Sequence, residues 1–261
     1  MRPRLSLPPR SVPAAQWSAS SARVETVGCG MAEILAIAHP DGGTVGVFNA
    51  AAAEESLSIE TWIPAEGGEP QRPLDQYSGL VVLGGDENIG EVDRYPYLER
   101  EYEIVNDWIE ADRPLFGVCL GAQMMAHVRG GSVFKMPEKE LGWIEIEQLP
   151  AAQDDPVAGF GPQLLTGLLW HSYGCEPPPE ATVLARNEVC VQAFKLGEAW
   201  GFQHHPEVDD QLLDEWLQPL LAGEAEGRRV AEIVDAGTAV HMATWNDYGR
   251  ELVRRFARRC A

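Results

Sequence analysis

Residues 114–123, with the sequence PLFGVCLGAQ, decide the fold of this chain. The segment begins with a short apolar run, typical of a buried strand, and continues into residues 120–128, which have a helical pattern. Gly117 and Gly121 bracket a single cysteine, Cys119, where strand changes to helix. This pattern predicts the sharp elbow that presents a nucleophile, because glycine tolerates a strained turn and a close neighbouring backbone.

The elbow would place the sulfur of Cys119 at the N-terminus of the following helix. The free N–H groups and the positive end of the helix dipole favour a thiolate over a thiol at that position. The alternative for a lone cysteine is a buried structural thiol at the end of a core strand. The two flanking glycines favour a nucleophile.

Composition indicates a globular protein and argues against several partners. The chain has 261 residues, of which 45% are hydrophobic and 23% charged, enough for one large domain or two small ones. Its formal net charge is −20, so we expect it to bind neither nucleic acid nor an anionic membrane. The five cysteines are irregularly spaced, which argues against a disulfide framework or a zinc site and for a reducing compartment, the cytoplasm. We expect no metal and no cofactor.

Residues 1–30 differ from the remainder of the chain, because they are rich in arginine, serine and proline and have no apolar periodicity. We expect a disordered tail there. Two alternatives are an organellar transit peptide and a natural start at Met31, which would make the segment a non-native extension. The folded domain is expected over residues 31–261.

Within that domain, short apolar runs alternate with helical patterns. Strands are expected at 32–38, 58–63, 77–83 and 114–118, and helices at 44–56, 96–111 and 120–128. Such alternation predicts a parallel sheet covered by helices on both faces. Gly84-Gly85 and Cys119 both follow predicted strands, so they could share the crevice at the carboxyl ends of the strands.

The second half of the chain predicts further strands and two helices. Strands are expected at 132–135, 143–147, 181–185, 190–194 and 199–203, the last three as an antiparallel extension, and residues 164–171 lead into Ser172-Tyr173-Gly174. Helices are expected around 212–220 and over 248–259.

Cys119 needs a general base, for which the six histidines are candidates. His204 and His205 end a predicted strand, and Glu207 follows after one proline. Neighbouring strand residues point to opposite faces, so one histidine at most faces a given crevice, whereas His205 and Glu207 can share a side. A carboxylate there would orient the imidazole of a nucleophile–base–orienter triad. The spacing alone is also compatible with two alternatives. The tandem histidines could lie at the surface, or a histidine could bind a metal together with Cys119.

These motifs together resemble the class I (triad) glutamine amidotransferase family, as a stand-alone, GMP-synthase-like domain. The likeness rests on GVCLGAQ at 117–123 and QHHPE at 203–207. Shorter matches follow in the expected order: LGG (83–85), YPYL (95–98), ELGW (140–143), WH (170–171) and QAF (192–194). The resemblance covers about residues 33–208 and implies a flavodoxin-like three-layer αβα sandwich. Residues 209–261 would be a C-terminal helical segment.

The resemblance also implies a role for each matching residue. Cys119 would attack the side-chain amide of glutamine, form a γ-glutamyl thioester and release ammonia. His205 would move the protons, and Glu207 would orient His205. Backbone N–H groups of Gly85 and Leu120 would hold the oxyanion.

Three further residues are implied to contact the substrate, namely Gln123, His171 and Trp143. The sequence departs from the family pattern at Asp86, where proline often follows the glycine pair, and at His204, where an aromatic is usual. Neither change removes a triad member, but both bear on whether free glutamine is the preferred amide donor.

The sequence contains no P-loop pattern and no dinucleotide fingerprint, so it has no evident acceptor-activating domain. The chain would therefore either dock on a separate synthetase or act alone on glutamine or another γ-glutamyl small molecule. Three functions remain open: a glutamine amidotransferase or glutaminase, a γ-glutamyl hydrolase or peptidase with the same triad, and a non-catalytic binding protein. The intact triad disfavours the third.

Overall fold

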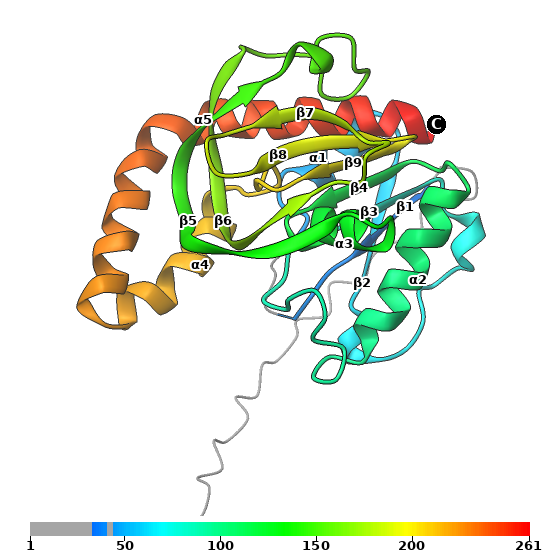
Figure 1. Ribbon diagram of the computed structural model, residues 1–261, viewed down its shortest axis with the longest axis horizontal. Coiled ribbons are helices and arrows are strands. Elements are labelled where there is room, and N and C mark those ends of the chain that lie inside the picture. Colours follow the sequence, from blue (N-terminus) through cyan, green and yellow to red (C-terminus); the bar gives the residue numbers. More distant parts are fainter. Residues whose placement is uncertain (1–32, 41–43) are drawn as a thin grey trace, which may run out of the picture. The chain divides into compact units, whose positions relative to one another are not determined.

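The computed structural model describes residues 33–40 and 44–261 (Figure 1). The predicted tail at residues 1–30 lies outside the described residues. The described residues form a mixed sheet of nine strands in the order β2-β1-β3-β4-β9-β8-β7-β5-β6. Helices cover both faces of this sheet, which confirms the predicted α/β fold.

One half of the sheet is parallel, as predicted for its first four strands. The strand expected at 199–203 as part of the antiparallel extension also belongs to this half, because it pairs in parallel with the strand that precedes Cys119 and antiparallel only with the next strand of the sheet. This half consists of β2 (Ser58–Trp62), β1 (Glu33–Ile37), β3 (Gly79–Val82), β4 (Leu115–Val118) and β9 (Ala199–Phe202). The helices that cover it are α1 (Phe48–Glu54) on one face, and α2 (Tyr97–Glu110) and α3 (Leu120–Val128) on the other. Because both faces are covered, the central strands are apolar throughout.

The other half of the sheet is antiparallel. It consists of β8 (Val191–Leu196), β7 (Thr182–Arg186), β5 (Ser132–Gln148) and β6 (Leu164–Glu176). The prediction of two strands at 132–135 and 143–147 was wrong, because both belong to β5, whose register shifts between Lys135 and Glu140. Pro137 lies in that interval and cannot donate a ladder hydrogen bond, which suits a bulge.

Two helices end the chain, α4 (Asp210–Ala222) and α5 (Ala225–Cys260). The helix predicted over 248–259 is only the last third of α5, which is 36 residues long. Its earlier part escaped prediction because its buried residues are few and include small ones such as Ala231. Among the described residues, no helix is long and apolar enough to cross a membrane.

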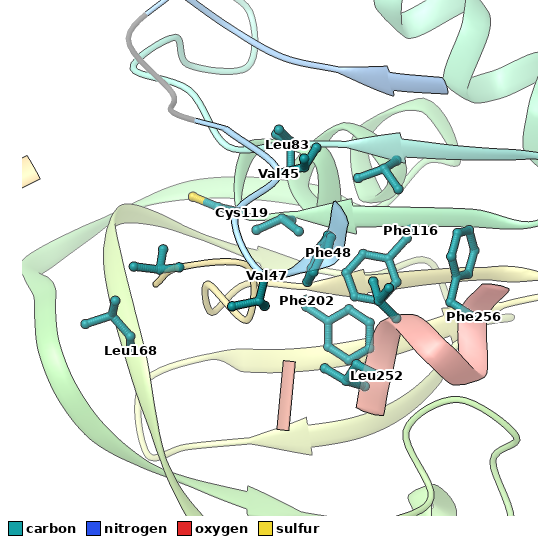
Figure 2. Packing of buried hydrophobic residues seen from close by; sticks show 14 of the residues in the cluster. Val45, Val47, Phe48, Leu83, Phe116, Cys119, Leu168, Phe202, Leu252 and Phe256 are labelled. Carbon is teal, nitrogen blue, oxygen red and sulfur yellow. The ribbon is translucent and has the colours of Figure 1, made fainter. Parts of the chain in front are cut away.

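An aromatic cluster fixes helices α1 and α5 on one face of the sheet (Figure 2). Phe116 of β4 stacks on Phe202 of β9, with ring centroids 4.6 Å apart. Phe48 of α1 and Phe256 of α5 meet Phe116 edge-on, at 5.3 and 5.4 Å. Figure 2 shows Cys119 beyond this cluster, with its sulfur directed away from the rings.

The predicted elbow is present between β4 and α3. Cys119 has φ 49° and ψ −102°, a strained backbone conformation for a residue with a side chain. Its N–H donates to the carbonyl of Phe202 at 2.7 Å. A Cβ on Gly121 would lie 2.2 Å from the Val82 carbonyl oxygen, and one on Gly117 would lie 2.7 Å from the sulfur of Met125. Glycine is therefore required at both positions by close packing.

We expect Gly121→Ala to lower the free energy of unfolding by at least about 3 kcal/mol, although alanine is the better helix former. The backbone of β3 cannot rotate away from the added methyl group. The control is Gly130→Ala, at φ 81°, where no described atom lies within 4 Å of the Cβ position. That change should cost only about 1–2 kcal/mol of backbone strain. Urea denaturation measures both, and equal losses would contradict the steric explanation.

Candidate active site

The segments that follow β3, β4 and β9 meet at one edge of the sheet. They bring together three predicted site residues, namely Cys119, His205 and Glu207. Nδ1 of His205 lies 2.7 Å from Oε1 of Glu207, and both side chains are buried. Gly84 lies between His205 and Cys119, because a Cβ there would be 2.9 Å from Cε1 of His205 and 3.4 Å from Cβ of Cys119. A glycine at this position lets the imidazole approach the cysteine.

His205 is in an environment that favours its protonated form. Burial by itself lowers the pKa of His205, but the charges of Glu207 and Cys119 outweigh burial and raise it to about 10. The ring is therefore protonated at neutral pH and can donate a proton beside Cys119.

His204 points to the opposite side of the chain, as strand alternation predicted. Its ring packs against Phe202 and Trp245, with centroids 5.4 and 5.5 Å apart. Burial, reinforced by neighbouring histidines, lowers the pKa of His204 to about 3, so this ring is neutral. Of the tandem pair, His205 is the one that faces Cys119.

The C-terminal helix α5 holds the loop that carries His205. Nε1 of Trp245 donates to the carbonyl of His205 at 2.8 Å. Gly249 lies so close to this loop that an added Cβ would be 1.9 Å from the carbonyl oxygen of Pro206. From the other side, the N–H of Val47 donates to the carbonyl of Glu207 at 3.0 Å. No local sequence motif indicates these contacts, since they join distant segments.

His39 lies beneath the glycine turn, where sequence reasoning had offered it only as one of six possible bases. Its Nδ1 is 2.9 Å from the carbonyl oxygen of Gly84, and its Nε2 is 3.0 Å from Oε2 of the buried Glu101. Both partners are acceptors, so both ring nitrogens donate. Burial lowers the pKa of His39, but Glu101 outweighs that effect and the net shift is upward.

This hydrogen bond orients one peptide group of the turn. In a trans peptide the C=O and N–H groups point in opposite directions. Because His39 holds the carbonyl of Gly84, the N–H of Gly85 points away from His39. The backbone of the predicted oxyanion turn is thus held in place by the hydrogen-bonded pair of His39 and Glu101.

Two cavities meet at Cys119. The smaller, about 150 Å³, is polar, and its lining includes two of the predicted substrate residues, Gln123 and His171. The larger, about 440 Å³, is lined by His205 together with residues of α4. Four residues line both cavities, namely Gly85, Asp86, Cys119 and Trp170.

Trp143 lies elsewhere, although it was expected to contact the substrate. Its Nε1 donates to Oγ1 of Thr238 at 3.1 Å, and its ring meets that of Trp245 edge-on at 6.2 Å. A Cβ on Gly237 would be 2.4 Å from the indole. Trp143 therefore packs against α5, and Gly142, at φ 109°, turns β5 immediately before it.

A buried cluster beside His171 was not anticipated. Glu140, His171 and Cys190 each place one donor atom within 4.8 Å of the others. Nδ1 of His171 donates to the carbonyl of Tyr173 at 3.0 Å, so its Nε2 faces Oε2 of Glu140 at 3.4 Å. Burial lowers the pKa of His171 to about 4, so this ring is neutral, and burial raises the pKa of Glu140. Asn187 also donates to Glu140 at 2.6 Å, and we assign no metal to this cluster.

Comparison with known proteins gives concordant matches. The family profile "Glutamine amidotransferase class-I" matches residues 51–217. The glutamine amidotransferase-like protein YfeJ of Salmonella typhimurium is 29% identical over 219 residues, 80% of this chain and 89% of YfeJ. One subunit of the glutamine-hydrolyzing GMP synthase of Methanothermobacter thermautotrophicus is 33% identical over 157 residues, 56% of this chain and 76% of that protein. A glutamine amidotransferase structure from Thermotoga maritima has a TM-score of 0.79 at 27% identity, covering 87% of this chain and 99% of the other.

We expect Glu207→Gln to lower the pKa of His205 toward the ordinary range of histidine, because the variant loses the negative charge that stabilises the imidazolium. An NMR titration of the His205 ring nitrogens measures this value. The matched control is Glu215→Gln, since Glu215 lines the same cavity as His205 but is exposed on α4. An unchanged His205 titration in Glu207→Gln would show that Glu207 does not control the charge of the base.

Proposed function

The chain belongs to the class I glutamine amidotransferase family, and on that premise we propose that it hydrolyses the side-chain amide of glutamine to glutamate and ammonia. One observation carries this proposal. The strained Cys119 shares a cavity with His205, and Glu207 holds that imidazole at 2.7 Å. A nucleophile, a base and an orienting carboxylate are the groups that thioester chemistry requires.

In the proposed reaction, Cys119 reacts as the thiolate, with its proton held by His205, and the sulfur attacks the amide carbon. The carbon–nitrogen bond breaks while His205 protonates the departing nitrogen, which leaves a γ-glutamyl thioester and free ammonia. His205 then takes a proton from water, and the resulting hydroxide attacks the thioester carbon. The carbon–sulfur bond breaks, the proton of the new carboxyl group passes to ammonia, and the Cys119 thiolate re-forms beside the protonated His205. Glu207 keeps Nδ1 of His205 protonated, so that Nε2 is the nitrogen that exchanges protons.

We further propose that the N–H groups of Gly85 and Leu120 stabilise the oxyanion. Leu120 is the first residue of α3, where N–H groups have no acceptor within the helix. The peptide that contains the Gly85 N–H is held by His39. One such donor is typically worth about 3 kcal/mol in the transition state.

The glutamyl part of the substrate is assigned to the smaller cavity. Gln123 and His171 line it, and Nε2 of Gln123 is already fixed by the carbonyl of Tyr173 at 3.0 Å and by Oε1 of Gln203 at 3.2 Å. A pre-positioned amide of this kind can orient a small polar substrate without rearrangement.

We also propose an acceptor for the ammonia and a cellular compartment for the protein. One relative is named as part of a glutamine-hydrolyzing GMP synthase, which supports a separate synthetase chain as the partner. Release of free ammonia, as by a glutaminase, is the alternative. The four described cysteines are free thiols, in keeping with the reducing cytoplasm.

A second candidate function is hydrolysis of other γ-glutamyl amides. The observation that favours it is the cavity of about 440 Å³ on the His205 side of Cys119, which is much larger than ammonia requires. A non-catalytic binding protein is less well supported, because binding alone gives no physical reason for the strained backbone of Cys119.

We expect Cys119→Ala to lower ammonia release from glutamine by roughly 10³-fold or more, as for other lost nucleophiles. A coupled glutamate dehydrogenase assay measures this release. Cys175→Ala is the matched control, because Cys175 is also buried and burial raises its pKa to about 12, which keeps it an inert thiol. Equal activity in Cys119→Ala and wild type would exclude the proposed nucleophile.

We expect His39→Leu to lower kcat about 10²-fold with little change in KM, since the Gly85 N–H acts on the oxyanion and not on bound substrate. His39→Asn should recover most of that loss, because the asparagine Nδ2 can still donate to the carbonyl of Gly84. Both variants remove the contact between residue 39 and Glu101. The difference in kcat between them therefore measures the hydrogen bond from residue 39 to the carbonyl of Gly84. Equal kcat in the two variants would contradict the positioning role.

A further inference from the structure

We propose that the larger cavity at Cys119 binds the leaving amine, and that it selects γ-glutamyl amides whose nitrogen carries an apolar or aromatic group. The inference rests on the proposed hydrolysis at Cys119 and names the substrate class that this site would take. It follows from the placement of the base, from the size of the cavity and from the side chains that line it.

The position of His205 decides which cavity receives the leaving group. The departing nitrogen must lie within reach of the proton donor, whereas the γ-glutamyl group stays on the sulfur. His205 lines the larger cavity, and Gln123 and His171 line the smaller one. The nitrogen and its substituent therefore extend into the larger cavity.

That cavity is far larger than ammonia. Its volume is about 440 Å³, whereas a molecule the size of water takes about 30 Å³ of liquid. A cavity of about 150 Å³ in another protein accommodates benzene. The leaving-group side of Cys119 thus has room for a substituent of aromatic size.

The walls of the cavity suit an apolar substituent. The lining includes Trp170 of β6, which also borders the smaller cavity, and three residues of α4, Trp216, Pro219 and Leu220. The rings of Trp170 and Trp216 lie 5.6 Å apart, and Trp216 meets the ring of His205 edge-on at 4.8 Å. An aromatic group placed beside the leaving nitrogen would contact these indoles.

Charge at the cavity also favours an amine product. Glu215 lines the cavity from α4 and is exposed. Breaking the amide transfers a proton from His205 to the nitrogen, and the free amine gains a second proton from water to become an ammonium ion. The carboxylate of Glu215 attracts that cation toward the open side of the cavity.

Helix α4 is part of the same folded chain, and its N-terminus is capped by Asp209, which accepts from the N–H of Leu212 at 2.9 Å. Ammonia destined for a separate synthetase would leave from the His205 side, where α4 lies. In this chain α4 forms the wall of the cavity on that side. A site enclosed in this way by its own chain is suited to hydrolysing a bulkier amide without a partner protein.

The test compares three substrates that differ only in the leaving amine: glutamine, γ-glutamylmethylamide and γ-glutamylbenzylamide. The full chain is assayed for glutamate release, with Cys119→Ala as the blank. We expect kcat/KM for the benzylamide to exceed that for the methylamide at least tenfold, from burial of the phenyl group. Slower turnover of the benzylamide than of the methylamide would overturn the inference.

Two variants link the preference to α4. Leu220→Trp fills the cavity and should lower the benzylamide-to-methylamide ratio of kcat/KM about tenfold. Leu220→Ala enlarges the cavity and should change that ratio less than Leu220→Trp does. The neighbouring Leu221 is exposed and does not belong to the cavity lining, so Leu221→Trp is the matched control. A ratio that Leu220→Trp leaves unchanged would contradict the assignment.

The substrate series also separates this inference from the function on which it rests. Cys119-dependent turnover of glutamine and the methylamide, without preference for the benzylamide, would overturn the amine site and support the glutaminase. Absence of Cys119-dependent turnover for all three amides would overturn the proposed hydrolysis itself, and the amine site with it.

Discussion

The contact between α3 and β3 is the constraint on which the remainder of the site depends. Gly121 lies so close to the Val82 carbonyl that no side chain fits between them. This approach forces the chain to turn within one residue, and Cys119 takes the strained conformation at the turn. Because β3, β4 and β9 are neighbours in register, the glycine turn, the cysteine and the His205 loop then end at the same edge.

The C-terminal segment completes a site whose motifs all lie before it. Helix α5 holds the His205 loop through Trp245 and the close approach of Gly249, and α4 places Trp216 against the ring of His205. These helices are therefore part of the candidate site and not an appendage. Their contribution is steric and apolar, while the earlier elements supply the polar groups that would do the chemistry.

Sequence alone predicted the features that depend on local patterns. Apolar runs located the parallel strands, two glycines located the elbow, and strand alternation separated His204 from His205. Long-range packing could not be predicted in the same way. The continuity of β5, the full length of α5, the place of Trp143 and the His39–Glu101 pair all depend on contacts between segments far apart in the chain.

A covalent γ-glutamyl enzyme is the central claim, and intact-protein mass spectrometry of an acid-quenched reaction with glutamine tests it most directly. The protein should gain the mass of one glutamyl group, and peptide mapping should place that group on the segment containing Cys119. Steady ammonia release without any adduct, or with the adduct on Cys175, Cys190 or Cys260, would contradict the thioester mechanism at this elbow.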